Sequence, residues 1–148
     1  MTVTKLTLAD VMEGLTGNRI EASQPISTVV IDSRQAEAGT LFVALPGEHT
    51  DGHHFVKDAF QRGAIAALVH QPVDACEEAQ VVRPGPDPIT LVARQPLCIQ
   101  VEDSLAGLQQ LARFWRQKFD VRTVGVTGSV GKSTTKELIW AVLSARFN

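Results

Sequence analysis

The chain has 148 residues, of which 44% are hydrophobic and 20% charged, and its formal net charge at pH 7 is -2. This composition is typical of a globular protein with a hydrophobic core, and the weakly negative charge argues against a nucleic-acid-binding surface. No apolar run approaches the roughly 20 residues that cross a bilayer, and the first residues lack the apolar region of a signal peptide. We therefore expect a cytoplasmic protein without membrane insertion.

The first third of the chain predicts a helix and a strand. Thr7 can cap a helix that ends before Gly17, and the apolar residues of this helix share one face: Leu8, Val11, Met12 and Leu15. Residues 26–34 predict a buried strand that ends in the polar tripeptide Asp-Ser-Arg (32–34). Polar groups at the end of a strand can present a ligand contact, whereas a local Asp–Arg pair in a turn is the simpler interpretation of the pattern alone.

A polar loop follows the second predicted strand, which covers residues 40–45. Four of its side chains could suggest a metal site: His49, Asp51, His53 and His54. Their spacing fits no established metal site, so we expect a loop that contacts substrate or caps the next helix. Cys76 and Cys98 also lack metal-type spacing, and we expect them to be reduced thiols without a function.

The middle of the chain predicts an α/β unit. A helix over residues 54–62 leads into a buried strand over residues 64–69, and a right-handed crossover would join the strands on either side of the helix. Weaker apolar runs predict further short strands at three places: 81–82, 89–92 and 97–101. A helix beginning at Glu102 carries an apolar stripe that we expect to pack rather than to bind a cofactor: Leu105, Leu108, Leu111, Ala112, Trp115 and Phe119.

The last predicted elements are a strand over residues 121–127, a glycine-bracketed loop and a helix. Gly128 and Gly131 can adopt positive φ, so backbone N–H groups can turn inward around an anion. Lys132 would reach the outer phosphates, and the Ser133 hydroxyl would ligate Mg²⁺ near the positive end of the helix. The pattern therefore predicts a bound nucleoside triphosphate with magnesium, and a glycine turn with a surface lysine is the simpler alternative.

This loop departs from the general phosphate-loop pattern G-x-x-x-x-G-K-[ST], because Val126 stands five positions before Gly131. The match is to the shorter form T-G-x-x-G-K-S-T. The predicted phosphate-binding residues are Gly128, Ser129, Val130, Gly131, Lys132, Ser133 and Thr134.

The loop leaves only one strand and one helix for its own sheet domain, so we expect a piece of a longer enzyme, with a domain boundary near Val101. The strand at 121–127 would have no partner within that domain. We expect it to pair with another copy of the chain or with the N-terminal sheet, or to be poorly ordered.

Three signatures give the sequence a resemblance to the ATP-dependent Mur ligases of bacterial peptidoglycan synthesis. They occur in the expected order between about Val29 and Leu143, and they lie at residues 32–34 with 39–47, at 51–53 and at 126–134. Residues 101–108 and 127–138 look most like MurF, the subfamily that adds D-alanyl-D-alanine to a UDP-N-acetylmuramoyl tripeptide. The MurE subfamily, which adds the third amino acid, is a close alternative.

The resemblance implies an α/β protein in two parts. Residues 1–101 would form a small mixed-sheet domain that binds the UDP end of the substrate, and residues 102–148 would form a linking helix and the start of an ATP-binding domain. The residues implied to contact uracil, ribose or diphosphate are Ile31, Ser33, Arg34, Glu48, His49 and Thr50. Lys132 would be the catalytic residue on the ATP phosphates, and Ser133 would contact Mg²⁺.

In this family, ATP phosphorylates the terminal carboxylate of the peptide, and an amine attacks the acyl phosphate to give an amide, ADP and phosphate. The later metal-binding and amino-acid-binding parts of the family lie beyond Asn148, so we expect no ligase activity from this chain alone. Two other classes stay open: a non-catalytic nucleotide- or UDP-sugar-binding module, and a ParA-like partition ATPase. Against the second, Thr127 replaces the signature lysine of that class, which also has its loop near the N-terminus.

Overall fold

The computed structural model describes residues 5–22, 24–48, 50–74, 78–84, 89–91 and 95–146. Its elements follow one another along the chain, in the order α1 (Leu8–Thr16), β1 (Val29–Val30), η1 (Ser33–Gln35), β2 (Leu41–Val43), η2 (Gly52–Phe55), α2 (Val56–Gln61), β3 (Ala66–Val69), β4 (Gln80–Val82), β5 (Leu97–Gln100), α3 (Ser104–Gln117) and α4 (Lys132–Ser144). The two η elements are short 3₁₀ helices.

Five strands form one sheet in the order β1-β2-β3-β5-β4, and Ala66 of β3 lies between Leu41 of β2 and Leu97 of β5. The predicted α/β class is confirmed. All four strand pairings are parallel, whereas the expectation was a mixed sheet. The strand ends therefore share one side, called here the carboxyl edge, which comprises residues 31–34, 44–48, 50–53, 70–71, 83–84 and 101–104.

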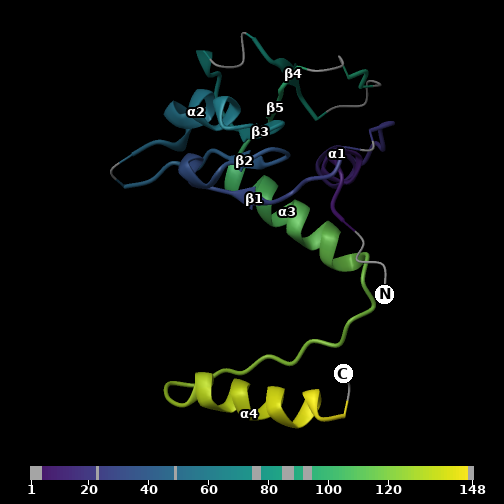
Figure 1. Ribbon diagram of the computed structural model, residues 1–148, viewed down its shortest axis with the longest axis vertical. Coiled ribbons are helices and arrows are strands. Elements are labelled where there is room, and N and C mark those ends of the chain that lie inside the picture. Colours follow the sequence, from purple (N-terminus) through teal and green to yellow (C-terminus); the bar gives the residue numbers. More distant parts are fainter. Residues whose placement is uncertain are drawn as a thin grey trace.

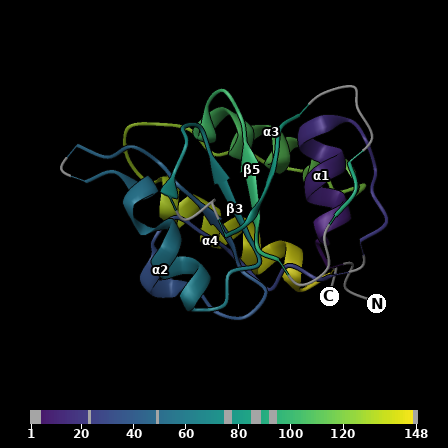
Figure 2. The ribbon, with the colours of Figure 1, turned by 90° about the horizontal axis from the view of Figure 1, so that it is seen from above.

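Both faces of the sheet are covered, so neighbouring residues of one strand enter different cores. Leu41 and Val43 of β2 belong to the core that includes α1 and Leu111 of α3, whereas Phe42 belongs to the core that includes Val56 of α2. Figure 2 shows α2 and α1 on opposite sides of β3 and β5. Burial on both faces explains why the strands are nearly continuous apolar runs instead of alternating ones.

Helix α1 begins and ends as predicted. The hydroxyl of Thr7 accepts a hydrogen bond from the N–H of Asp10 at 3.2 Å, and the Asp10 carboxylate accepts one from the N–H of Thr7 at 2.9 Å. This reciprocal pair satisfies two backbone donors that the helix itself leaves open. Gly17 ends the helix with a φ of 76°, a left-handed conformation that glycine adopts without strain.

Helix α3 packs with only part of the predicted apolar stripe. Leu111 is buried and Leu108 packs against the same core, whereas Leu105 is 49% exposed. The buried face also contains Gly107, which the stripe did not include: a Cβ there would lie 3.2 Å from Leu68 Cδ2, so glycine lets the helix approach β3.

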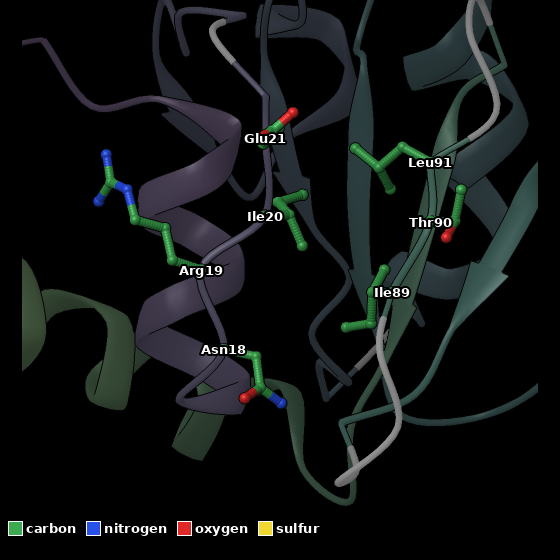
Figure 3. A pocket seen from close by; sticks show the side chains of 7 residues that line it. All are labelled: Asn18, Arg19, Ile20, Glu21, Ile89, Thr90 and Leu91. Atoms are coloured by element: carbon green, nitrogen blue, oxygen red, sulfur yellow. The ribbon is translucent and has the colours of Figure 1, made fainter.

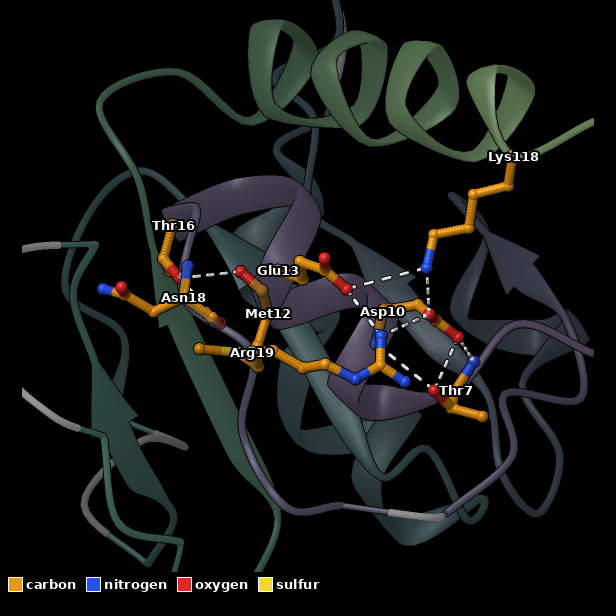
Figure 4. A network of polar contacts seen from close by, with 8 residues as sticks. All are labelled: Thr7, Asp10, Met12, Glu13, Thr16, Asn18, Arg19 and Lys118. Atoms are coloured by element: carbon orange, nitrogen blue, oxygen red, sulfur yellow. Dashed lines mark hydrogen bonds and ion pairs between the residues drawn. The ribbon is translucent and has the colours of Figure 1, made fainter.

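Four charged residues join α1 to the end of α3 and to the segment after α1 (Figure 4). The ammonium of Lys118 lies 2.6 Å from Oδ1 of Asp10, and Arg19 contacts Asp10 at 3.4 Å and Glu13 at 2.6 Å. Burial raises the pKa of Asp10, but hydrogen bonds from Lys118 and Thr7 outweigh it and lower this pKa from 3.8 to about 2. The ionised carboxylate therefore fixes α3 on α1.

After α3 the chain leaves this body, and an extended segment leads to α4, which lies apart from the sheet in Figure 1. Residues 121–131 are all described and form no strand, so the predicted strand at 121–127 is wrong here. Nothing within the described residues offers this segment a ladder of backbone partners, and a lone strand is not stable. The predicted pairing with the N-terminal sheet is likewise not found, and pairing with another copy stays a prediction. α4 buries none of its residues.

Three further expectations concern membrane spans, the two cysteines and a strand over residues 89–92. None of the described helices is long and apolar enough to span a membrane. Cys98 lies buried in β5 and is disulfide-bonded, so the expectation of a reduced thiol is wrong for this residue, and Cys76 lies outside the described residues. Spacing in the sequence does not reveal which thiols a fold brings together. Residues 89–91 form no strand, and residue 92 is not described.

Candidate functional site

A tight hairpin follows β2 at the carboxyl edge. We call residues 45–52 the edge hairpin; residue 49 within it is not described. An antiparallel bridge joins Pro46 to Asp51, and backbone hydrogen bonds of 2.9 Å close both the base and the tip. Glu48 and Thr50 lie exposed near the tip. The hairpin therefore presents two of the predicted UDP-contact residues to solvent, and the predicted contact His49 lies outside the described residues.

The turn after β1 carries the other predicted UDP contacts. Ile31 is 60% exposed, whereas the side chain of Ser33 is buried and hydrogen-bonds the carboxylate of Asp58 on α2. Arg34 donates from Nε and Nη2 to the two oxygens of Asp32, at 2.9 and 2.7 Å. These bonds from the Arg34 side chain, and one from its backbone N–H, lower the pKa of Asp32 to about 2. The local Asp–Arg pair thus exists, and the Arg34 side chain remains 81% exposed.

The β1 turn and the edge hairpin follow adjacent strands and lie at the same edge of the sheet. An arginine, backbone N–H groups and hydroxyls suit a nucleoside diphosphate, because a guanidinium binds phosphate oxygens in a forked geometry. The parallel sheet places the turn with Ile31 and Arg34 at the same edge as Glu48 and Thr50, while the side chain of Ser33 is turned to Asp58. The open side of a parallel sheet beyond its strand ends is also where α/β proteins bind their ligands.

A partly buried polar cluster around the buried His53 supports the base of the edge hairpin. Asp51 Oδ1 lies 2.6 Å from Nδ1 of His53, whose side chain is 1% exposed, and Asp51 Oδ2 accepts a hydrogen bond from the Gln71 amide at 2.9 Å. The N–H of His70 donates to Nε2 of His53 at 3.2 Å. The backbone N–H and the ring of His53 lower the pKa of Asp51 to about 2. Both ring nitrogens of His53 are thus occupied by protein groups.

Three residues of this edge were not predicted from the sequence to have a function: His70, Gln71 and Ser104. His70 Nδ1 lies 3.0 Å from the hydroxyl of Ser104, the first residue of α3. The available signal was position, since His70 and Gln71 directly follow the buried strand that ends at Val69. Their partners could not be foreseen, because the partners depend on which strands are neighbours.

The phosphate loop has the predicted backbone at both glycines. Gly128 has a φ of 144° and Gly131 a φ of 80°, and α4 begins at Lys132, so the N-terminus of the helix faces the loop. The ammonium of Lys132 donates to the carbonyl of Gly128 and so lies over the turn. The remaining predicted phosphate contacts are exposed: Ser129, Val130, Ser133 and Thr134.

These residues fit a phosphate ligand by conformation and by charge. Two glycines have the positive φ that lets backbone N–H groups turn toward an anion, and a lysine stands beside them. For Mg²⁺ the protein offers the Ser133 hydroxyl, and no group of three acidic, histidine or cysteine side chains with metal-binding geometry occurs in the described part of the chain. The site therefore suits an ion that arrives with its phosphate ligand better than an independently bound ion.

A cavity of about 580 Å³ lies between residues 18–21, which follow α1, and residues 89–91 (Figure 3). Ile20, Ile89 and Leu91 line it together with polar side chains, and none of the predicted site residues does. Arg19 points away from these apolar side chains in Figure 3 and is engaged by the acidic residues of α1. We therefore assign this cavity no part in the predicted UDP or phosphate sites.

Comparison with known proteins adds a family to this geometry. Residues 25–116 match the model for the Mur ligase family, catalytic domain. The chain belongs to the Mur ligase family. It is 44% identical over 119 residues to the UDP-N-acetylmuramoyl-tripeptide–D-alanyl-D-alanine ligase of Synechocystis sp., a match that covers 80% of the chain and 23% of the relative.

Two further members of the family are informative. A UDP-N-acetylmuramoyl-L-alanyl-D-glutamate–2,6-diaminopimelate ligase of Chlorobium phaeobacteroides is 40% identical over 125 residues, covering 83% of the chain and 22% of the relative. The crystal structure of MurF ligase from Thermotoga maritima in complex with ADP superposes with a TM-score of 0.61 at 30% identity, covering 82% of the chain and 24% of that structure. The chain thus spans about a quarter of the length of the Mur ligases that it matches.

Proposed function

We propose that this Mur ligase chain serves the ATP-dependent joining of D-alanyl-D-alanine to a UDP-N-acetylmuramoyl tripeptide in peptidoglycan synthesis. The observation that carries the proposal is the pairing of two features in one chain: a carboxyl edge with Arg34 and the edge hairpin, and a glycine loop with Lys132 at a helix N-terminus. The similarity to a ligase named for this reaction supports it. The proposal places the protein in the cytoplasm, where nucleotide-linked precursors and ATP are found.

In the proposed reaction the terminal carboxylate of the tripeptide attacks the γ-phosphorus of ATP and displaces ADP. The amine of D-alanyl-D-alanine then attacks the activated carbonyl carbon, phosphate leaves and the amine loses a proton, which gives the amide. Lys132 would stabilise the negative charge of the transferring phosphoryl group, and Ser133 would contribute one oxygen to Mg²⁺ beside phosphate oxygens and water. Lys132 is the catalytic residue of this proposal.

The UDP part of the proposal predicts that Arg34 binds a diphosphate. Calorimetric titration with UDP should give at least about fivefold weaker binding for Arg34→Met, because an exposed charge contributes roughly 1 kcal/mol. Arg113→Met is the control, since Arg113 is an exposed arginine of α3 outside the carboxyl edge. Equal loss of affinity in both variants, or in neither, would remove Arg34 from the site.

The 148-residue chain should bind these ligands without turning over ATP. Every residue of the predicted phosphate loop is exposed, and within the described residues no second element faces the loop to exclude water or complete a magnesium site. ADP release in the presence of ATP, Mg²⁺, a UDP-N-acetylmuramoyl tripeptide and D-alanyl-D-alanine is the measurement. Turnover above that of the Lys132→Met variant would refute the expectation.

A ligase that adds the third amino acid is the second candidate, because the 2,6-diaminopimelate ligase relative is nearly as similar over the same share of the chain. An assay of a full-length Mur ligase that includes this sequence would decide between them. Under the first proposal, D-alanyl-D-alanine and a tripeptide substrate support ADP formation. Under the second, a free amino acid and a dipeptide substrate do so.

A further inference from the structure

The tip of the edge hairpin can contact a ligand only if its base is fixed. The two sides of the base are in backbone contact: a Cβ on Gly52 would lie 2.8 Å from the nitrogen and 2.9 Å from the oxygen of Leu45. The hairpin is therefore one stiff unit, and its orientation is set where that unit meets the sheet. Asp51, one of the two bridge residues, connects the hairpin to the sheet through its side chain.

Asp51 connects the hairpin to the end of β3 by two routes. Its Oδ2 accepts a hydrogen bond from the Gln71 amide at 2.9 Å, and its Oδ1 contacts the ring of His53, which in turn accepts from the N–H of His70 at 3.2 Å. Both routes end on consecutive residues just beyond β3. The hairpin is thus held by β3 although it follows β2 in the chain.

The hydrogen-bond partners assign the tautomer of His53. A backbone N–H can only donate, so Nε2 of His53 must accept the bond from His70 and carries no proton. The proton of the neutral ring therefore sits on Nδ1 and is donated to Asp51. A neutral ring that donates at one nitrogen and accepts at the other fits both partners. An apolar side chain of similar size would leave the N–H of His70 without this acceptor and would remove one of the hydrogen bonds to Asp51.

The end of β3 is itself held in place. The ring of His70 contacts the Ser104 hydroxyl at 3.0 Å and meets the His53 ring edge-on, with centroids 4.3 Å apart. Ser104 is fully buried at the start of α3. A continuous series of contacts therefore runs from the hairpin through β3 to the helix that is fixed on α1.

We infer that Asp51, His53 and Gln71 are positioning residues, which set the orientation of the edge hairpin toward the uridine diphosphate group without touching it. This rests on the proposed function, because it takes Glu48 and Thr50 at the tip as the contacts. It assigns a role to the partly buried pair of Asp51 and His53 that needs neither a metal ion nor a proton-transfer step.

The test compares Gln71→Met and His53→Leu with two controls, Gln61→Met at an exposed site of α2 and His54→Leu at the exposed neighbour of His53. Gln71→Met is the decisive variant, because Gln71 is only partly buried and its loss should leave the fold intact, whereas His53→Leu removes a buried group. Melting temperature, calorimetric affinity for UDP, affinity for ADP and amide hydrogen exchange of the peptide covering residues 45–52 are measured on all four.

Gln71→Met should bind UDP about five- to tenfold more weakly, because it loses a hydrogen bond to a charged group, while its ADP affinity stays unchanged. The amides of Gly47 and Gly52, which close the hairpin, should exchange about tenfold faster than in the controls. Unchanged exchange and unchanged UDP affinity in Gln71→Met would overturn the inference. If the unaltered chain does not bind UDP, the proposed function fails instead, and the exchange comparison alone then decides whether Gln71 anchors the hairpin.

Discussion

Replacing Lys132 by methionine should weaken Mg-ATP binding by about 100-fold or more, which corresponds to roughly 3 kcal/mol, because the loop then loses the ammonium that lies beside its two positive-φ glycines. Methionine keeps the length and the helix preference of lysine and removes only the ammonium. Calorimetric titration of the chain with ATP and magnesium measures the effect.

Lys136→Met is the matched control for this prediction. Lys136 lies one helical turn further along α4 and is equally exposed, so it shares the charge and the helix but not the loop. Its variant should bind ATP within about twofold of the unaltered chain, since an exposed charge at that distance is screened by salt. If Lys132→Met binds ATP as well as Lys136→Met does, the loop is a glycine turn with a surface lysine.

Removing the negative charge of Asp10 should lower the free energy of unfolding, because the ionised carboxylate joins α1 to α3 through Lys118. The folded-state pKa of about 2 lies below the ordinary value of 3.8, and a difference of this size corresponds to roughly 2–3 kcal/mol of stabilisation by the ionised form. Asp10→Asn should therefore lower the melting temperature by about 5–10 °C. Glu13→Gln, which changes a more exposed member of the same ion network, should cost under about 1 kcal/mol.

The same carboxylate predicts an acid-sensitive window. Because folding lowers the pKa of Asp10, its contribution is fully present above about pH 4 and is lost as the pH falls toward 2. Urea unfolding at a series of pH values between 6 and 2 should show a smaller loss of stability for Asp10→Asn than for the unaltered chain. Parallel curves for the two proteins would mean that the Asp10–Lys118 pair is energetically neutral.

Local patterns predicted those parts of the fold that local residues determine. The cap at Thr7 and the stop at Gly17 place α1, and the two loop glycines have the predicted positive φ because that conformation depends on a few neighbouring residues. The predicted UDP and phosphate contacts rest on motifs of the same kind, and their roles stay predictions.

The remaining features depend on neighbours that are distant in the sequence. The anchoring of the edge hairpin needs β3 to lie beside β2, and the buried face of α3 depends on the approach of Gly107 to Leu68 as well as on Leu111. The predicted strand at 121–127 failed for the same reason, since an apolar run becomes a strand only where another strand offers backbone partners.

The ion pair between Lys118 and Asp10 also sets where the molecule can hinge. Because the last turn of α3 is fixed on α1, a swing of the nucleotide loop relative to the carboxyl edge must be absorbed by dihedral rotations after Lys118. The tether from there to Gly128 reaches at most about 35 Å when fully extended. Under the proposed function, this length limits how far the predicted phosphate loop can lie from the end of α3.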